Sequence, residues 1–496
     1  MVRAKARLVA RGFKQREGID FFETFAPTPA ASCFRLLGAI ACELGLDLCH
    51  FDAEQAFVQS SLEEDAFMRL PPGCGEMSGK IVRLNRSLYG LKQASRSWHN
   101  HLLTHMKNLG FEQSPADACV MRLIESGSVS IVTVVHVDDI FAVGLKSRCD
   151  QFCEDLNRLV PINNLGRLRW YAGCRFSRDW DAGTLTISQQ AFAENTAARF
   201  NVNSGRNTPL STGLKLEEFD ENEPVGDWPF RELVGCLMWL ANQTRPDIAN
   251  AVRAVARYAN KPREVHWKTA IGILEYVFST SDFGITFQRG SGLELVAFAD
   301  ADYASKATDR RSVSGGAIMC AGACVCWFSR TQKCVTLSTT EAEYVALADT
   351  IKEAMFMRYV WSFIFPGFGE VCMTVFEDNE GAKHLAQNPK CTSNSKHIDV
   401  RHHFLRELIF KGEFIIAHVE TDEQHADFLT KPLNYTAFCY HRDFLMNILC
   451  ISGIRVYVTV FELELYLSYI SNDNAVFPWL ILRIMPFFLA LNFVGF

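Results

Sequence analysis

The sequence lacks several features that would assign it to a simple class. Its 17 cysteines include no Cys-x-x-Cys pair, and the close group Cys320, Cys324 and Cys326 does not have the spacing of a zinc site. A net charge of −6 gives no general signature of nucleic-acid binding. Scattered cysteines, together with the lack of a visible secretory leader, indicate free thiols in a reducing compartment.

The chain also lacks an internal repeat and a low-complexity linker, although its 496 residues exceed what one hydrophobic core can hold. We therefore expect roughly two to four domains. The apolar segment 477–496 is long enough to span a bilayer. Arg483, Pro478 and Pro486 argue against this, because charges and helix breakers are costly inside a membrane. We expect no membrane contact.

Positive charge is concentrated at the start of the chain. Residues 1–16 contain no acid and carry the cations Arg3, Lys5, Arg7, Arg11, Lys14 and Arg16. A local basic strip of this kind suits phosphate groups better than the mildly acidic average suggests. The alternative is a solvated basic terminus without a ligand.

Hydrophobic periodicity predicts helices and strands along most of the chain. In the first part we expect a basic hairpin within 1–30, helices at 32–45, 92–109 and 147–158, a strand at 46–51, a turn at 71–73 and an antiparallel pair within 166–188. Helices follow at 190–200, 228–242, 246–260 and 266–278. We then expect strands at 293–299, 313–320, 323–329, 333–338, 371–377 and 414–420, and helices at 339–362, 380–387, 398–411 and around Asp427. Strands followed by alternating helix and strand indicate a separate α/β domain.

Two adjacent acids, Asp138 and Asp139, interrupt the apolar run 129–144. Ionised carboxylates on an apolar strand are tolerated mainly when they are paired or bound to metal. The pattern predicts a hairpin with the acids at its tip, and Asp52 ends another predicted strand. These three acids could hold two divalent cations, most naturally Mg²⁺, which promote in-line phosphoryl transfer. The alternative is that Asp138 and Asp139 simply form a turn.

Four blocks of the sequence resemble the reverse transcriptase of copia-type retrotransposons, in the same order and with similar spacing. They are residues 5–27, 51–73, 84–99 and 136–139. The resemblance implies that Asp52, Asp138 and Asp139 are the metal-binding carboxylates of a polymerase palm.

The same resemblance implies a nucleotide site. Phe57 falls where the family places an aromatic gate against a ribose 2′-OH, although a core phenylalanine is the alternative. Lys5 and Arg7 match basic residues that hold the incoming triphosphate, and the segment that closes over the nucleotide contains Tyr89, Gly90 and Lys92. The charged residues among them could also be solvated surface groups.

The sequence departs from the family at several points. His136 stands where a tyrosine is usual, and segment 266–280 has Ile271, Gly272 and Glu275 where lysine and arginine are common. A thumb helix with fewer cations would follow a duplex less tightly, increasingly so at higher salt. The chain also begins inside the expected fingers, so we interpret it as N-terminally truncated.

Later blocks resemble the RNase H domain that follows reverse transcriptase in copia-type elements. They are 293–304, 312–317, 337–347, 375–386 and 422–433. The resemblance implies a mixed sheet and a four-acid centre that binds two Mg²⁺ ions around an RNA phosphate and activates water. By this alignment the acids are Asp300, Glu341, Asp378 and Asp427.

Each of these acids has an alternative interpretation. Glu341 forms a capping box with Ser338, Asp378 could begin a helix, and Asp302 competes with Asp300. Three nearby histidines are not expected to bind metal, namely His397, His402 and His403. A fourth, His425, could assist product release. Three arginines lie between the two regions, namely Arg245, Arg253 and Arg257. They could contact a nucleic-acid backbone, or they could simply keep the surface soluble.

The sequence therefore predicts an α+β protein: a reverse-transcriptase palm, fingers and thumb followed by an α/β RNase H-like domain. We expect fingers and palm at 1–190, thumb or connection helices at 191–290, the RNase H-like domain at 291–435 and a poorly packed apolar tail at 436–496. The expected function is an RNA-directed DNA polymerase with RNase H activity and two Mg²⁺ or Mn²⁺ ions in each site. Its partners would be an RNA template, a DNA primer, dNTPs and an RNA–DNA hybrid.

Other outcomes stay open. An inactive or domesticated relic that only binds nucleic acid would account for His136 and the reduced thumb charge, but the presence of all the candidate acids argues against it. An RNase H nuclease with a crippled polymerase is a second alternative. A homodimer is also open. The type of element implies a cytoplasmic location, in a virus-like particle, with a nuclear phase.

Overall fold

In the computed structural model, the described residues are 8–214, 216, 226–305, 310–368, 371–387 and 399–448, without the side chains of 368 and 399–403. They belong to one unit that runs to Ile448. Lys5, Arg7, His397 and the segment 449–496 lie outside the described residues, as do the side chains of His402 and His403.

The first sheet is built around two apolar strands, β6 (Ser128–His136) and β7 (Asp139–Gly144). Both are buried on both faces, which explains their continuous hydrophobic runs. The order of the sheet is β4-β5-β6-β7-β1-β8. Helix α1 (Ala31–Leu44) packs on the face that carries Phe141, whereas α3 (Ala94–Asn108) and α4 (Lys146–Asn157) pack on the face that carries Ile140. The strands are β1 (Asp47–Ala53), β4 (Glu112–Gln113), β5 (Val120–Glu125), β6 (Ser128–His136), β7 (Asp139–Gly144) and β8 (Ile162–Arg167).

The predicted basic hairpin within 1–30 is wrong for the described residues. A 3-10 helix, η1 (Gly12–Lys14), precedes an isolated bridge between Glu17 and Phe21. The N–H of Ala10 donates to the carbonyl of Tyr89 (2.7 Å), so the segment 89–93 takes the place of a partner strand.

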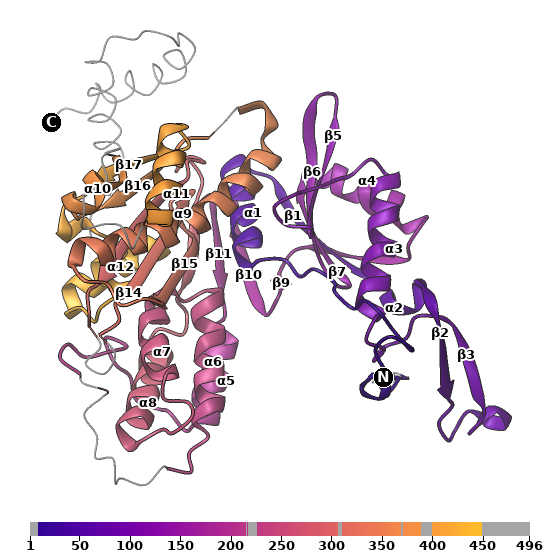
Figure 1. The fold of residues 1–496 in the computed structure, drawn as a ribbon. Helices are drawn as coiled ribbons and strands as arrows, with labels where there is room; N and C mark the ends of the chain where they lie inside the picture. Colours follow the sequence, from indigo (N-terminus) through magenta and orange to yellow (C-terminus); the bar gives the residue numbers. More distant parts are fainter. Residues whose placement is uncertain are drawn as a thin grey trace. The chain divides into compact units, whose positions relative to one another are not determined.

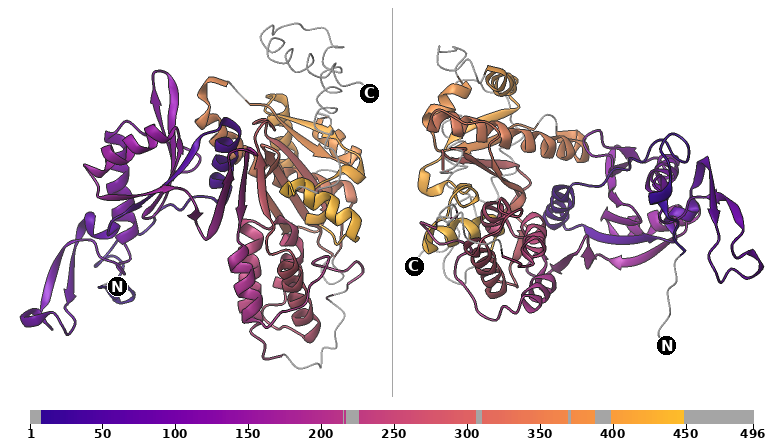
Figure 2. Two further views of the ribbon diagram at one scale, coloured as in Figure 1. Left: turned by 180° about the vertical axis from the view of Figure 1, so that it is seen from behind. Right: turned by 60° about the horizontal axis from the view of Figure 1, so that its bottom comes forward.

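A separate hairpin, β2 (Ser61–Arg69) with β3 (Ile81–Arg86), projects from the first half of the chain in both views of Figure 2. The predicted turn at 71–73 lies in its connection, together with η2 (Gly75–Met77). Helix α2 (Ala56–Gln59) leads from β1 into this hairpin.

A second sheet has the order β12-β11-β10-β9, with β9 (Trp170–Tyr171), β10 (Cys174–Asp179), β11 (Thr184–Ser188) and β12 (Gly284–Gln288). Between β11 and β12 the chain forms four helices that lie side by side in Figure 1. They are α5 (Gln190–Arg199), α6 (Phe230–Gln243), α7 (Ala249–Ala256), preceded by η3 (Pro246–Ile248), and α8 (Glu264–Ser279). Strand β12 was not predicted, because its short run Gly-Ile-Thr-Phe-Gln follows directly on a helical pattern.

The third sheet is mixed, with the order β15-β14-β13-β16-β17. Strands β13, β14 and β15 are antiparallel neighbours, whereas β13, β16 and β17 run parallel. The long helix α9 (Thr339–Ile364) packs on it. The strands are β13 (Val296–Asp302), β14 (Val313–Cys320), β15 (Ala323–Thr331), β16 (Met373–Glu377) and β17 (Phe414–His418); the further helices are η4 (Pro366–Phe368), α10 (Glu380–Gln387), α11 (Asp399–Phe410), η6 (Thr421–Glu423) and η7 (Asp427–Leu429).

The strand predicted at 333–338 is wrong. Strand β14 begins at Val313, which pairs with Thr331, and therefore offers no partner beyond that point. The residues instead lead into the cap of α9 at Ser338.

The prediction of a poorly packed tail is wrong for its first part. Residues Tyr435–Met446 form the helix α12, in which Leu445 and Met446 are fully buried. The ring of Phe438 lies 5.7 Å from that of Tyr276, and the side chain of Asn447 donates to the carbonyl of Thr286 (2.8 Å). The helix is therefore part of the core formed with α6, α7 and α8.

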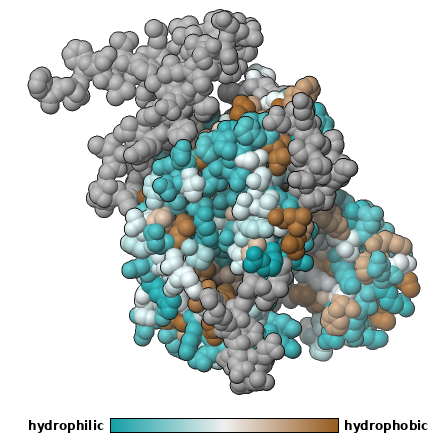
Figure 3. Space-filling view, turned by 60° about the vertical axis from the view of Figure 1, so that its left-hand side comes forward, coloured by the Kyte–Doolittle hydropathy of each residue, from teal (hydrophilic) through white to brown (hydrophobic). Residues whose placement is uncertain are grey.

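The described residues thus form an α+β fold whose third sheet is mixed, as predicted, while the domain boundaries stay predictions. In Figure 3, one face of the surface is mostly hydrophilic, with hydrophobic side chains in small separate patches. The fifteen described cysteines are all free thiols. No described helix combines the length and hydropathy needed to cross a bilayer.

Candidate functional site

The first set of predicted acids lies where β1 meets the β6–β7 hairpin. Asp52 and Asp139 are opposite each other in the antiparallel pair β1–β7, and His136 is opposite Asp139 across the hairpin. Val137 and Asp138 form the two-residue turn between His136 and Asp139. All three carboxylate residues are half-buried. The fold therefore brings together acids that are 86 or more positions apart in the chain.

Asp139 already has a partner that the sequence analysis missed. The Nε2 of His50 lies 2.9 Å from Asp139 Oδ1. His50 precedes Asp52 by two positions on β1, so both side chains are on one face of the strand. This alternation was the signal that could have identified His50.

Tyr171 closes the same region from β9. Its ring meets those of His50 and His136 edge-on, with centroids 6.1 and 6.3 Å apart. Burial, and then the charge of Asp139, raise the pKa of the Tyr171 phenol. The candidate polymerase centre therefore has an aromatic wall next to its carboxylates.

The structure describes four of the predicted nucleotide residues, namely Phe57, Tyr89, Gly90 and Lys92. The rings of Phe57 and Tyr89 pack with centroids 4.7 Å apart, and both are half-buried, which leaves the gate and core interpretations of Phe57 open. Gly90 has a φ of 92°, and a Cβ there would meet the carbonyl oxygen of Ala10 at 2.2 Å. The backbone N–H of Lys92 donates to Gln15 Oε1 (2.8 Å).

The second set of acids is gathered more tightly, but with a different glutamate from the one predicted. Ligand oxygens of Asp300 on β13, Glu343 on α9 and Asp378 after β16 all lie within 4.8 Å of one another. Within the described ranges, no other group of three or more His, Cys, Asp or Glu side chains meets this spacing. Asp52, Asp138 and Asp139 do not reach it.

Glu341 does not join this cluster, and its assignment needs correction. Its Oε2 accepts the N–H of Leu337 (2.6 Å), while its own N–H donates to Ser338 Oγ (3.1 Å). The bond to Ser338 caps the first turn of α9, and the bond from Leu337 ties the Glu341 carboxylate to the residue before that cap. Glu343 is two residues further on, about 200° around the helix, and faces the sheet instead.

Asp427 lies beside the cluster and is bound to a lysine that was not predicted. Lys431 Nζ is 2.8 Å from Asp427 Oδ1, and the hydroxyl of Thr430 donates to Asp300 Oδ2. Asp302, the rival of Asp300, is outside the group of three. The placement therefore favours Asp300.

The cluster is electrostatically strained. Burial and the nearby Asp427 raise the pKa of Asp300 to about 8. Burial and neighbouring acids also raise the pKa values of Glu343 and Glu377, and Glu377 is fully buried at the end of β16. One oxygen of each glutamate, Oε2, is buried without a hydrogen-bond partner. Oxygen donors of this kind fit a hard divalent cation.

The remaining candidate residues make other contacts or lie on the surface. Arg245 is buried against Asp247 (2.7 Å), so surface solubility does not explain it. Arg253 donates to Ser329 Oγ (3.0 Å), while Arg257 is exposed. His425 is buried with its Nδ1 3.1 Å from that of His441.

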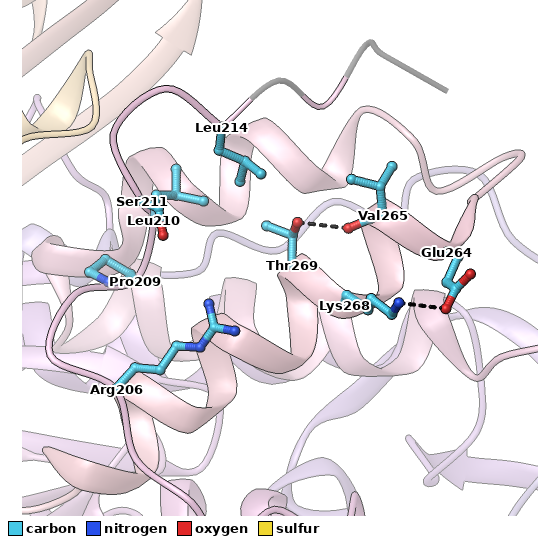
Figure 4. Close-up of a pocket in the computed structure, with 9 residues that line it drawn as sticks. All are labelled: Arg206, Pro209, Leu210, Ser211, Leu214, Glu264, Val265, Lys268 and Thr269. Carbon is cyan, nitrogen blue, oxygen red and sulfur yellow. Dashed lines mark hydrogen bonds and ion pairs between the residues drawn. The ribbon is translucent and has the colours of Figure 1, made fainter. Parts of the chain in front are cut away.

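A hollow of about 470 Å³ lies between α8 and the segment before α6 (Figure 4). Both basic side chains that line it form ion pairs, Lys268 with Glu264 (2.7 Å) and Arg206 with Glu275 (2.6 Å). It shares no residue with either acidic cluster. It is lined by Arg206, Pro209, Leu210, Ser211, Leu214, Glu264, Val265, Lys268 and Thr269.

Comparisons with known proteins point the same way as the blocks in the sequence. Residues 1–212 match the family described as reverse transcriptase (RNA-dependent DNA polymerase). The chain is 34% identical to the retrovirus-related Pol polyprotein from transposon TNT 1-94 of Nicotiana tabacum, over 88% of the chain and 34% of that protein. It is 32% identical to the Pol polyprotein from transposon RE2 of Arabidopsis thaliana, over 88% of the chain and 30% of that protein. The chain thus spans about a third of the length of these relatives.

Among solved structures, LC11-RNase H1, isolated from compost, matches 28% of the chain and 92% of its own length at 13% identity. Its TM-score of 0.23 is too low to carry an argument.

Proposed function

We propose that this chain, which is similar to the Pol polyproteins of transposons TNT 1-94 and RE2, is an RNA-directed DNA polymerase joined to an RNase H. The polymerase would extend a DNA primer on an RNA template with dNTPs. The RNase H would cut the RNA of the resulting hybrid.

The observation that carries the RNase H part of the proposal is the acidic cluster of the buried Asp300 and Glu343 with the half-buried Asp378. Carboxylates buried this closely repel one another and lose hydration, which is unfavourable unless a cation compensates. We infer that they hold Mg²⁺ or Mn²⁺, with Asp427 completing the set. The metal would supply Lewis acidity and an activated water.

Within this site, the chain's own residues would do the positioning. The Thr430 hydroxyl orients Asp300 by donating to its carboxylate, and Lys431 neutralises Asp427. The water would attack the phosphorus of the RNA, and the 3′ oxygen of the preceding nucleotide would leave. Lys431, half-buried at this edge, would offer positive charge to a phosphate of the backbone.

At the polymerase centre, Asp52, Asp138 and Asp139 are the residues that would bind the cations, as the family match supports. His50 would orient Asp139 through its 2.9 Å contact. The primer 3′ oxygen would attack the α-phosphorus of the dNTP, and pyrophosphate would leave. Phe57, packed on Tyr89, would lie under the sugar and exclude a 2′-OH.

A second candidate function is a nuclease with a crippled polymerase. The observation in its favour is that the RNase H acids lie within 4.8 Å while the polymerase acids do not. In that case hybrid cleavage would occur without any primer extension.

The test is a pair of assays on the same protein: primer extension on poly(rA)/oligo(dT) and cleavage of an RNA–DNA hybrid, each with Mg²⁺ or Mn²⁺. We expect Asp138→Asn to abolish the first and Glu343→Gln to abolish the second. Glu341→Gln is the matched control for Glu343, since it removes the neighbouring acid of the same helix. Cleavage that survives Glu343→Gln, or extension that survives Asp138→Asn, would refute the corresponding site.

A further inference from the structure

We propose that Trp98 is a positioning residue of the polymerase centre: its indole N–H holds the turn that carries Asp138. This inference rests on the proposed polymerase function. It concerns a side chain that touches neither a nucleotide nor a metal ligand directly, and it adds a residue on α3 to a site whose acids lie on β1 and β7.

The turn at the hairpin tip has an unfavourable backbone conformation. Val137 has a φ of 61°, in the left-handed region. A two-residue hairpin turn with a positive φ at its first position usually has glycine there. For a β-branched residue this conformation is a genuine outlier, which persists only where the surrounding structure imposes it. The turn therefore needs support from outside the hairpin.

Trp98 provides this support. Its Nε1–H donates to the carbonyl oxygen of Val137 at 2.6 Å, and the residue is only 1% exposed. The indole belongs to the same core as Phe51 and Ile140, the strand residues that precede Asp52 and follow Asp139. The donor end of this part-buried bond is shielded from water by the core, which favours one direction of the Val137 carbonyl.

The next carbonyl of the turn is held as well. The N–H of Ala53, the residue after Asp52, donates to the carbonyl of Asp138 at 2.8 Å. The turn is thus fixed from one side by α3 and from the other by β1. Both bonds act on the backbone that sets the direction of the Asp138 and Asp139 side chains relative to Asp52.

Helix α3 is itself tied to the N-terminal segment through Gln15 and Asp20. Gln93, the residue before its first turn, is buried: its Oε1 accepts from Gln15 Nε2 (3.0 Å), and its Nε2 donates to the carbonyl of Asp20 (3.1 Å). Trp98 follows one turn later on the same helix. Because it supports the acids and not the nucleotide, its loss should lower kcat and leave KM for the dNTP unchanged.

The decisive variant is Trp98→Phe, which removes the N–H and keeps an aromatic ring. Trp327→Phe is the matched control, because Trp327 makes the same type of bond, from Nε1 to the carbonyl of Ala241 (2.8 Å), on β15. The measurements are kcat and KM for dTTP on poly(rA)/oligo(dT), hybrid cleavage by the same preparation, and hydrogen exchange of the peptide containing 133–141.

We expect Trp98→Phe to lower kcat by at least about tenfold. The KM for dTTP and the rate of hybrid cleavage should stay within about twofold of the parent values. Exchange of the turn peptide should rise about threefold to tenfold, the effect of one lost hydrogen bond. Trp327→Phe should change none of these. Adding Val137→Gly to Trp98→Phe should restore part of kcat, because glycine adopts the positive φ without support.

Unchanged kcat and unchanged exchange in Trp98→Phe would overturn the proposal, as would equal losses in the two tryptophan variants. Failure of Val137→Gly to restore any activity would also overturn it, including where Trp98→Phe alone folds poorly. If the parent protein extends no primer, the proposed polymerase function fails instead, while the exchange of the turn still decides whether Trp98 holds it.

Discussion

Replacing Asp300 by asparagine should change how the stability of the metal-free protein depends on pH. The folded state raises the pKa of Asp300 from an ordinary 3.8 to about 8, through burial and the charge of Asp427. A carboxyl group with a raised folded pKa favours folding while it is protonated. Its contribution is therefore complete below pH 3.8 and is lost progressively as the pH rises toward 8.

The size of the effect follows from the linkage relation. Each pH unit between the two pKa values removes up to about 1.4 kcal/mol of unfolding free energy from the parent, and none from Asp300→Asn. Between pH 5.5 and 7.5 the variant should gain about 2.7 kcal/mol on the parent. The contributions of distant titrating groups cancel in the difference, whereas Glu343 and Glu377, whose pKa values Asp300 raises, contribute a smaller change of their own.

The measurement is urea unfolding in EDTA at pH 5.5, 6.5 and 7.5, repeated with Mn²⁺. A cation at 100 times its dissociation constant should add about 2.7 kcal/mol to the parent, and much less to Asp300→Asn. Asp302→Asn is the control: its carboxyl also has a raised pKa, but it lies outside the cluster, so the Mn²⁺ effect should survive. A gap that stays constant or narrows with pH would refute the reasoning, as would full Mn²⁺ stabilisation of Asp300→Asn.

Further predictions follow from the same geometry. Glu343→Gln should reduce hybrid cleavage by at least roughly 10³, or about 4 kcal/mol of barrier. Glu341→Gln should keep cleavage and nearly all of the stability, measured by thermal unfolding, because the glutamine oxygen still accepts the N–H of Leu337. Phe57→Ala should raise the use of rNTPs relative to dNTPs by at least about tenfold in primer extension, and an unchanged ratio would favour a core role. Burial and Lys431 lower the pKa of His441 to about 4, so its folded form stays neutral and stability should fall as the pH drops below 6.5. His441→Gln should reduce this acid-induced loss of unfolding free energy by up to about 3 kcal/mol at pH 4, measured by urea unfolding. An unchanged loss would contradict the role of His441.

The strands and helices with strong periodicity could be predicted from the sequence, because their patterns match the structure that buries them. The hairpin at Asp138 is an example: its apolar flanks pack on both faces, and its acids fall at the tip. Helix α1 likewise ends at Gly45, whose φ of 64° closes the helix as expected. Such local signals do not depend on which other segments are nearby.

Other features depend on distant partners and had no local signal. The strand expected at 333–338 is missing because β14 offers no backbone beyond Val313, and the strand β12 exists because β11 is there to pair with it. Which face of α9 meets the sheet decides between Glu341 and Glu343, and both glutamates fit the same short motif. His50 and Trp98 bear on the polymerase acids only through contacts across the fold.

The helix α12 also determines where the gene could be divided for expression. A fragment that stopped at the boundary expected at 435 would leave the rings of Tyr276 and Phe298 without their neighbours Phe438 and Phe444. It would expose apolar surface that soluble domains normally cover and would invite aggregation. A stop codon after Ile448 keeps that cover in place.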